Sequence, residues 1–136
     1  MNRSMARFAL CLVAFLLGAM VALGGEPKIR QLEFYSLAPD TQVVLRTKSR
    51  VITLDMVDPA EGEVLIRTSS DGEIFNEPRT AFLLGATKGK QQGALSLVEM
   101  GVVRAGLKLE LGLGNLLVAN RVHTSEITSI ELRLNK

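Results

Sequence analysis

The residues that could do chemistry gather in one stretch near the C-terminus, GLKLELGLGNLLVANRVHTSEI, which spans residues 106–127. It contains a Gly-x-Gly sequence that starts at Gly112, the chain's only histidine, His123, and a nearby serine, Ser125. Glycine-rich loops bind phosphate groups, and a histidine that contacts a serine hydroxyl forms a nucleophilic pair. The stretch is therefore a phosphate loop, part of a hydrolytic site, or a β-hairpin that carries no chemistry.

The phosphate interpretation fails on spacing. A dinucleotide-binding loop needs a third glycine and a following helix, and a P-loop ends in Gly-Lys-Ser or Gly-Lys-Thr. Neither pattern follows Gly114. We therefore expect no nucleotide cofactor at this position.

The serine and the histidine are also poorly placed for catalysis. His123 shares its strand parity with polar Arg121 and lies opposite Val122, so we expect it to point away from the core. Ser125 is two residues further on, roughly 6.5–7 Å along a strand that rises ~3.3 Å per residue. A surface histidine is the preferred interpretation, and a hydrolase that uses Ser125, His123 and a distant carboxylate is a remote alternative.

A β-hairpin accounts for the same residues. Gly114-Asn115 can form a two-residue turn, because both residue types tolerate positive φ. This turn pairs Leu113 with Leu116 and Leu111 with Val118, and it keeps the apolar side chains on one face. The apolar positions before the turn are Val103, Ala105, Leu107, Leu109, Leu111 and Leu113, while Arg104, Lys108 and Glu110 have the opposite parity.

No metal site is predicted. One histidine and no cysteine outside the N-terminal leader exclude a site built from those ligands. An acidic turn is formed by Asp55, Asp58, Glu61 and Glu63, but it lacks the spacing of a calcium loop. We expect no catalytic, cofactor-binding or metal-ligating residues, and we expect residues 87–93 (TKGKQQG) to form a mobile loop.

Residues 1–25 form a leader with a basic start and an uncharged stretch from Phe8 to Gly25. This is the form of a secretory signal, with Ala22 to Gly24 as the cleavage site, or of a retained membrane anchor. Lipidation at Cys11 is not expected, because bulky Leu10 precedes it. The positive-inside rule places the N-terminus in the cytoplasm and the body in the periplasm, and cleavage would release the body there.

The net charge gives no reason to expect a charged partner. The 136-residue chain has 16 basic and 14 acidic residues, and two of the basic ones, Arg3 and Arg7, lie in the leader. The body therefore has 14 of each sign. This balance argues against a nucleic-acid-binding protein, which needs a concentrated basic surface.

The body has the period-two pattern of short strands. At residues 51–57, Ile52, Leu54 and Met56 alternate with polar Thr53 and Asp55. Turns are expected at 58–62 and 68–72. The sequence predicts one all-β domain over residues 43–136, a small barrel or sandwich of about 6–8 short, mainly antiparallel strands preceded by an N-terminal apolar helix. Residues 26–42 are a linker or a first strand, and the further strands are expected at 43–47, 64–66, 80–84, 94–100, 103–113, 116–123 and 129–134.

A pattern across residues 43–130 resembles a group of small uncharacterised bacterial all-β proteins. It comprises residues 49–54, then Phe75, Pro78, Ala81, Gly85 and Gly89, then GVVRAGLKLEL and VHTSEITSI. The chain departs from that pattern at Val51, where the group has tyrosine, and at Ala86, where it has serine. The resemblance implies the all-β fold and no activity.

Three functions follow as hypotheses. The first is a non-catalytic extracytoplasmic β-domain, an accessory or interaction subunit of a membrane or envelope complex with a protein partner and, if the leader is uncleaved, contact with the membrane. The second is a small-ligand or lipid-binding β-barrel in which the leucine face lines a cavity. The third is the hydrolase that uses Ser125 and His123.

Overall fold

The fold is known from a computed structural model, which describes residues 28–92 and 95–134. These residues form ten strands and three short 3₁₀ helices, η1 (Phe34–Ser36), η2 (Pro59–Glu61) and η3 (Val118–Asn120), with no α-helix among them. The strands are β1 (Gln31–Glu33), β2 (Thr41–Thr47), β3 (Val51–Asp58), β4 (Glu63–Ser69), β5 (Arg79–Gln92), β6 (Leu95–Met100), β7 (Val102–Arg104), β8 (Lys108–Leu113), β9 (Arg121–His123) and β10 (Ile127–Leu134).

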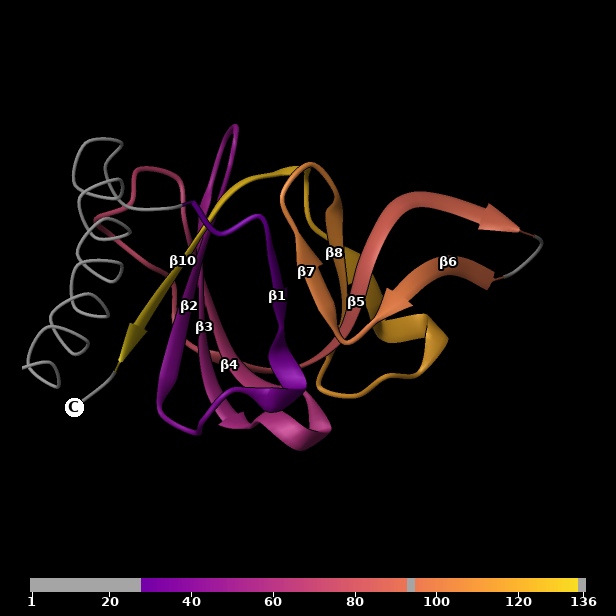
Figure 1. The fold of residues 1–136 in the computed structure, drawn as a ribbon, viewed down its shortest axis with the longest axis horizontal. Helices are drawn as coiled ribbons and strands as arrows, with labels where there is room; N and C mark the ends of the chain where they lie inside the picture. Colours follow the sequence, from indigo (N-terminus) through magenta and orange to yellow (C-terminus); the bar gives the residue numbers. More distant parts are fainter. Residues whose placement is uncertain (1–27, 93–94, 135–136) are drawn as a thin grey trace, which may run out of the picture.

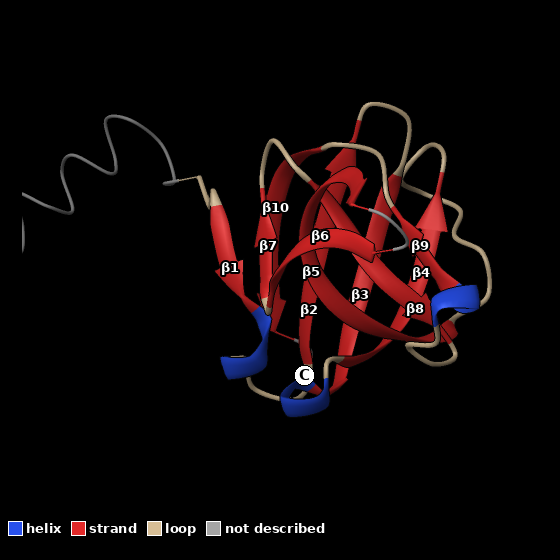
Figure 2. Ribbon diagram, turned by 90° about the vertical axis from the view of Figure 1, so that its right-hand side faces the viewer, coloured by secondary structure: helices blue, strands red, loops and turns tan. Residues whose placement is uncertain are grey.

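The strands form two open antiparallel sheets (Figure 1). The main sheet has the order β10-β2-β3-β4-β5-β8-β9, with β6 paired to β5, and β1 pairs with β7 in a second sheet. Its strong curvature is visible in Figure 2. The predicted all-β antiparallel fold is confirmed, with ten strands in place of the expected 6–8.

The core lies on the concave face of the curved sheet. Strand side chains point alternately to the two faces, so the apolar residues of one parity are buried together. Ile52, Leu54 and Met56 on β3 are buried as the alternation predicts. They pack in one cluster with residues of the neighbouring strands, among them Val43, Leu45, Val64, Ile66, Leu83, Leu109 and Leu111.

The N-terminal part of the described chain belongs to this fold. Within residues 26–42, where the sequence left a linker or a first strand open, the structure has strand β1 and helix η1. Leu32 and Phe34 from this segment are buried in the core cluster. The leader and its predicted helix lie outside the described residues, and none of the helices in the described part is long and apolar enough to cross a bilayer.

Two predicted strands are wrong in extent. Residues 103–113 do not form one strand, because the chain turns at Gly106 between β7 and β8, where the Gly106 N–H donates to the Ile127 carbonyl (2.8 Å). Of residues 116–123, only the last three form a strand, β9. The predicted turn at 58–62 is present as η2, with Gly62 in the left-handed conformation after it.

The predicted mobile loop at residues 87–93 is also wrong over its described part. Residues 87–92 belong to β5, which pairs with β6 in a long hairpin that extends away from the rest of the molecule (Figure 1). The ladder is interrupted between Thr87 and Gln91, and Gly89 has a φ of 81°. A bulge of this kind explains the polar, glycine-containing sequence without a loop.

A hairpin does form within residues 106–127, but its strands pair in a register that differs from the predicted one. β8 pairs with β9 so that Leu111 lies opposite Val122 instead of Val118. The connection is longer than two residues because the Asn115 Oδ1 atom accepts hydrogen bonds from the Leu117 N–H (3.0 Å) and the Asn120 Nδ2 atom (2.7 Å), and η3 follows. The shift is four residues, an even number, so Val122 and His123 keep their predicted faces. Val118 does not: it was expected on the apolar face, but it is 66% exposed because it lies on η3 and not on a strand.

Candidate functional site

His123 and Ser125 do not form a nucleophilic pair in the described part of the chain. His123 is exposed, as its parity predicts, and its Nδ1 atom lies 3.3 Å from the Thr124 carbonyl oxygen. Ser125 is exposed as well, and its carbonyl accepts a hydrogen bond from the Thr124 hydroxyl (2.7 Å). No hydrogen bond joins the Ser125 hydroxyl to the His123 ring within the described residues, so the geometry gives no support to the hydrolase.

The predicted acidic turn holds no cluster of ligands. Asp55 accepts hydrogen bonds from the Gln42 Nε2 atom (2.8 Å) and from Arg67 (3.0 Å), so its carboxylate is already paired. Across residues 28–92 and 95–134, no group of three or more His, Cys, Asp or Glu side chains is close enough to hold a metal ion.

Glu110 is the one predicted surface residue of this stretch that the structure buries. It is 2% exposed, and its Oε2 atom has no hydrogen-bond partner in the described part of the chain. Its Cα partners are Gly85 on β5 and His123 on β9. The parity of Glu110 is as predicted, but parity gives only the face of a strand and not what covers that face.

A concave site, a pocket with a volume of about 390 Å³, lies at one end of the main sheet. Its floor is apolar, because Ile52, Ile66 and Leu111 of the core cluster reach it together with Leu113 and the half-exposed Val122. Its rim is polar. The rim residues are Thr47, Arg50, Thr68, Asn76, Arg79, His123, Thr124 and Ser125.

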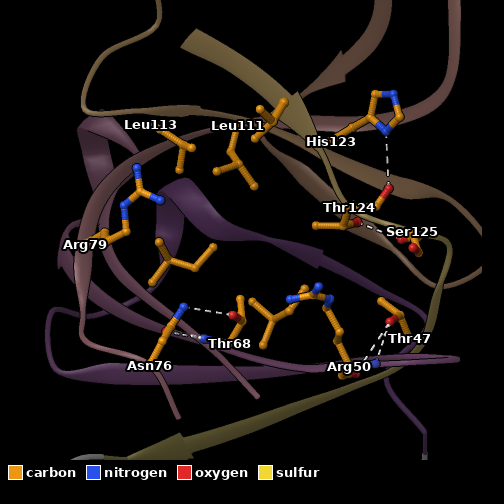
Figure 3. A pocket seen from close by; sticks show the side chains of 13 residues that line it. Thr47, Arg50, Thr68, Asn76, Arg79, Leu111, Leu113, His123, Thr124 and Ser125 are labelled. Carbon is orange, nitrogen blue, oxygen red and sulfur yellow. Dashed lines mark hydrogen bonds between the residues drawn. The ribbon is translucent and has the colours of Figure 1, made fainter. Parts of the chain in front are cut away.

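Several parts of the fold, from the end of β2 to the segment after β9, supply this pocket (Figure 3). The turn between β2 and β3 places Arg50, and the Thr47 hydroxyl accepts a hydrogen bond from the Arg50 N–H (3.2 Å). The first residue of β5 is Arg79, whose Cα partner on β4 is buried Ile66. Cross-strand partners point to the same face, so Arg79 stands at the concave side above the apolar floor.

The loop between β4 and β5 forms another wall and is held by side-chain hydrogen bonds. Asn76 acts like a strand partner of Thr68: its Oδ1 atom accepts from the Thr68 N–H (2.8 Å) and its Nδ2 atom donates to the Thr68 hydroxyl (3.0 Å). At the other end of the loop, the Asp71 Oδ1 atom accepts from the N–H groups of Glu73 (2.8 Å) and Ile74 (3.1 Å) and from the Ser69 hydroxyl (2.8 Å).

These hydrogen bonds to the ionised carboxylate lower the pKa of Asp71 from 3.8 to about 2, the N–H of Glu73 having the largest effect. A lowered pKa means that the charged form stabilises the fold. This contribution is complete above the unfolded pKa of 3.8 and is lost as the pH falls towards 2. The wall of the pocket should therefore weaken in acid.

We expect Asp71→Asn to lower the melting temperature above pH 4 and to have a much smaller effect near pH 2, where the carboxylate is becoming protonated, because the amide keeps the acceptor oxygen but lacks the charge. Melting curves of both proteins, recorded by circular dichroism across this range, measure the difference. Glu77→Gln is the control, since Glu77 is exposed in the same loop. A difference between Asp71→Asn and the unaltered protein that stays constant with pH would contradict the prediction.

The comparisons with known proteins add no identity. No protein family matches the chain, and no curated protein or solved structure is significantly similar to it. The resemblance to small bacterial all-β proteins therefore stays a prediction.

Sequence reasoning missed the pocket, although one signal for it was present. Arg79 shares its parity with Ala81 and Leu83, so an inward-facing arginine begins an apolar strand face. The predicted strand started at residue 80 and left Arg79 out. Nothing in the sequence brings Arg50 to the same pocket, because the two residues are far apart along the chain and come to one pocket only in the folded sheet.

Proposed function

We propose that this protein is a non-catalytic binding domain and that the pocket at the end of the main sheet is its binding site for a small ligand with an apolar body. The observation that carries the proposal is the floor of the pocket, where three core side chains, Ile52, Ile66 and Leu111, line a concave space open to solvent. Small-molecule sites are typically concave, mostly apolar and ~300–1,000 Å³ in volume. At about 390 Å³, this pocket lies within that range.

The proposal develops the predicted ligand-binding alternative in a modified form. A ligand-binding barrel would hold its ligand along the leucine face, but here Leu109 and its neighbours fill the interior with core packing. Only the end of the leucine face, at Leu111 and Leu113, reaches the pocket. The structure has two open sheets, so the finer prediction of a small barrel or sandwich stays a prediction, and the proposal does not need it.

The cellular setting comes from the sequence. The leader supports a location in the bacterial envelope, with the pocket on the periplasmic side. Within that setting, an accessory or interaction subunit of an envelope complex stays a prediction, and ligand binding in the pocket is compatible with it.

The test fills the pocket with a side chain. Val122 lines the pocket and is 43% exposed, so Val122→Trp should place an indole over the apolar floor with little disturbance of the core. We expect this variant to lose most of its crosslinking to a photoreactive alkyl alcohol at the pocket strands, measured by peptide mass spectrometry.

Val118→Trp is the matched control, because Val118 is 66% exposed on η3 and does not line the pocket. It should crosslink as the unaltered protein does. The chain has no other tryptophan, so fluorescence of each variant reports whether the new indole is shielded from water. Equal crosslinking of the two variants at the pocket strands would show that the pocket is not the binding site.

A further inference from the structure

We infer that the pocket selects an amphipathic carboxylate, a small molecule with an apolar body and one anionic head, over neutral and cationic molecules with the same body. This inference rests on the proposed function, because it names the class of ligand that the pocket takes. It goes beyond that function in assigning the head-group contacts to Arg50 and Arg79.

The charge of the pocket lining favours an anionic head. The charged residues that line the pocket are Arg50 and Arg79, and no aspartate or glutamate is among the lining residues. A cationic head would meet like charges there, and an anionic head would meet opposite ones. In contrast, Arg46 and Glu131 lie together in the hollow beside β10 and are joined by a salt bridge (3.2 Å).

The two arginines are free to bind a ligand. Neither the Arg50 nor the Arg79 guanidinium has a hydrogen bond or an ion pair with another described residue. Most other described arginines have a hydrogen-bond partner for the guanidinium group. These arginines are Arg46, Arg67, Arg104, Arg121 and Arg133. Two cations that border one pocket without a counter-ion are therefore a distinctive feature of this site.

The neutral groups of the rim are largely occupied by hydrogen bonds within the protein. Asn76 and Thr68 bond each other, the Thr47 hydroxyl bonds the Arg50 backbone, and the Thr124 hydroxyl donates to the Ser125 carbonyl. The guanidinium groups are thus the principal free donors for a ligand's head. A guanidinium matches a carboxylate in shape and binds it with two parallel hydrogen bonds.

The geometry places these donors beside the apolar floor. Figure 3 shows Arg79 next to Leu113 and the Arg50 side chain extending into the pocket from the β2–β3 side. An apolar body over Ile52, Ile66 and Leu111 would exclude water from the neighbouring rim. Because charge-assisted hydrogen bonds strengthen where water is excluded, the floor and the arginines favour the same kind of molecule.

The experiment compares octanoate, octanol and octylamine, which share one apolar body. The full-length protein is isolated without detergent, in polymer-bounded membrane discs if the leader is retained and from the soluble fraction if it is removed. Each compound competes against the photoreactive alkyl alcohol, and crosslinking at the pocket strands is read by mass spectrometry. We expect octanoate to compete at about tenfold lower concentration than octanol, the ratio that one charge-assisted hydrogen bond provides, and octylamine to compete least.

The double variant Arg50→Gln/Arg79→Gln should bind octanoate no better than octanol while octanol binding is unchanged. The control Arg30→Gln/Lys88→Gln changes the net charge equally at two exposed positions outside the pocket lining and should keep the preference. Circular dichroism checks that each variant is folded, and the single arginine variants replace the double one if it is not.

The possible outcomes separate the inference from the proposed function. Octanol that competes as well as octanoate with the unaltered protein, or a folded arginine variant that keeps the full preference, overturns the inference and leaves the pocket as a neutral binding site. Crosslinking of the alcohol outside the pocket strands, or none at all, overturns the proposed function itself.

Discussion

Replacing Leu109 by alanine should lower the free energy of unfolding by about 2–5 kcal/mol, the range measured when a buried leucine is truncated. Leu109 is fully buried on β8, where it packs in the core cluster and lies opposite Ala86 of β5. Alanine would leave a cavity, because the neighbours come from several strands whose backbones are fixed by the sheet. Denaturant unfolding of a fragment of residues 26–136, followed by circular dichroism, measures the loss.

His123→Ala is the control variant for Leu109→Ala. His123 is exposed on the opposite face of the same hairpin, so its removal should change the free energy of unfolding by less than about 0.5 kcal/mol. A similar loss for His123→Ala and Leu109→Ala would show that the faces of β8 and β9 are assigned wrongly.

The faces of these strands could be predicted from the sequence because they depend on local alternation alone. Leu109 and Leu111 are buried and His123 is exposed, as parity requires. The pairing of the strands could not be predicted in the same way. Leu111 lies opposite Val122 because the Asn115 side chain and η3 organise a longer connection, and side-chain hydrogen bonds of this kind leave no periodic signal.

Strand lengths were misjudged where the sequence is polar. β5 continues through residues 87–92, where its hairpin partner β6 supplies the hydrogen bonds of the ladder. Polar composition predicted a loop for the same residues. A strand that is held mainly by its neighbour can thus have the composition of a loop.

The candidate site was largely beyond the reach of the sequence, for a geometric reason. The pocket joins the β2–β3 turn, the start of β5, the end of β8 and the segment after β9, which are far apart along the chain. Its chemistry lies in two arginines, Arg50 and Arg79, that border the same apolar floor from different parts of the fold. Single residues of this kind look like ordinary surface charges until the sheet brings them together.

Replacing Gly112 by alanine should cost at least about 3 kcal/mol, the upper end of the range for overpacking a closed structure. A Cβ atom at Gly112 would lie 1.9 Å from the Asn115 carbonyl oxygen and 2.8 Å from its carbonyl carbon. Both atoms are backbone, so the chain between β8 and η3 would have to move as a whole. Unfolding of the same fragment in denaturant measures this loss.

Variants at Gly114, two residues further on, distinguish the effect of a steric collision from the effect of backbone strain. Gly114 has a φ of 81°, and a Cβ atom there would meet nothing within 4 Å. Gly114→Asn should therefore cost little, since asparagine tolerates the left-handed conformation, while Gly114→Val should cost about 1–3 kcal/mol from strain alone. If Gly112→Ala proved as mild as Gly114→Asn, the chain after β8 could not fold back over Gly112. The longer connection that sets the register of β9, and with it the position of Val122 at the pocket, would then be wrong.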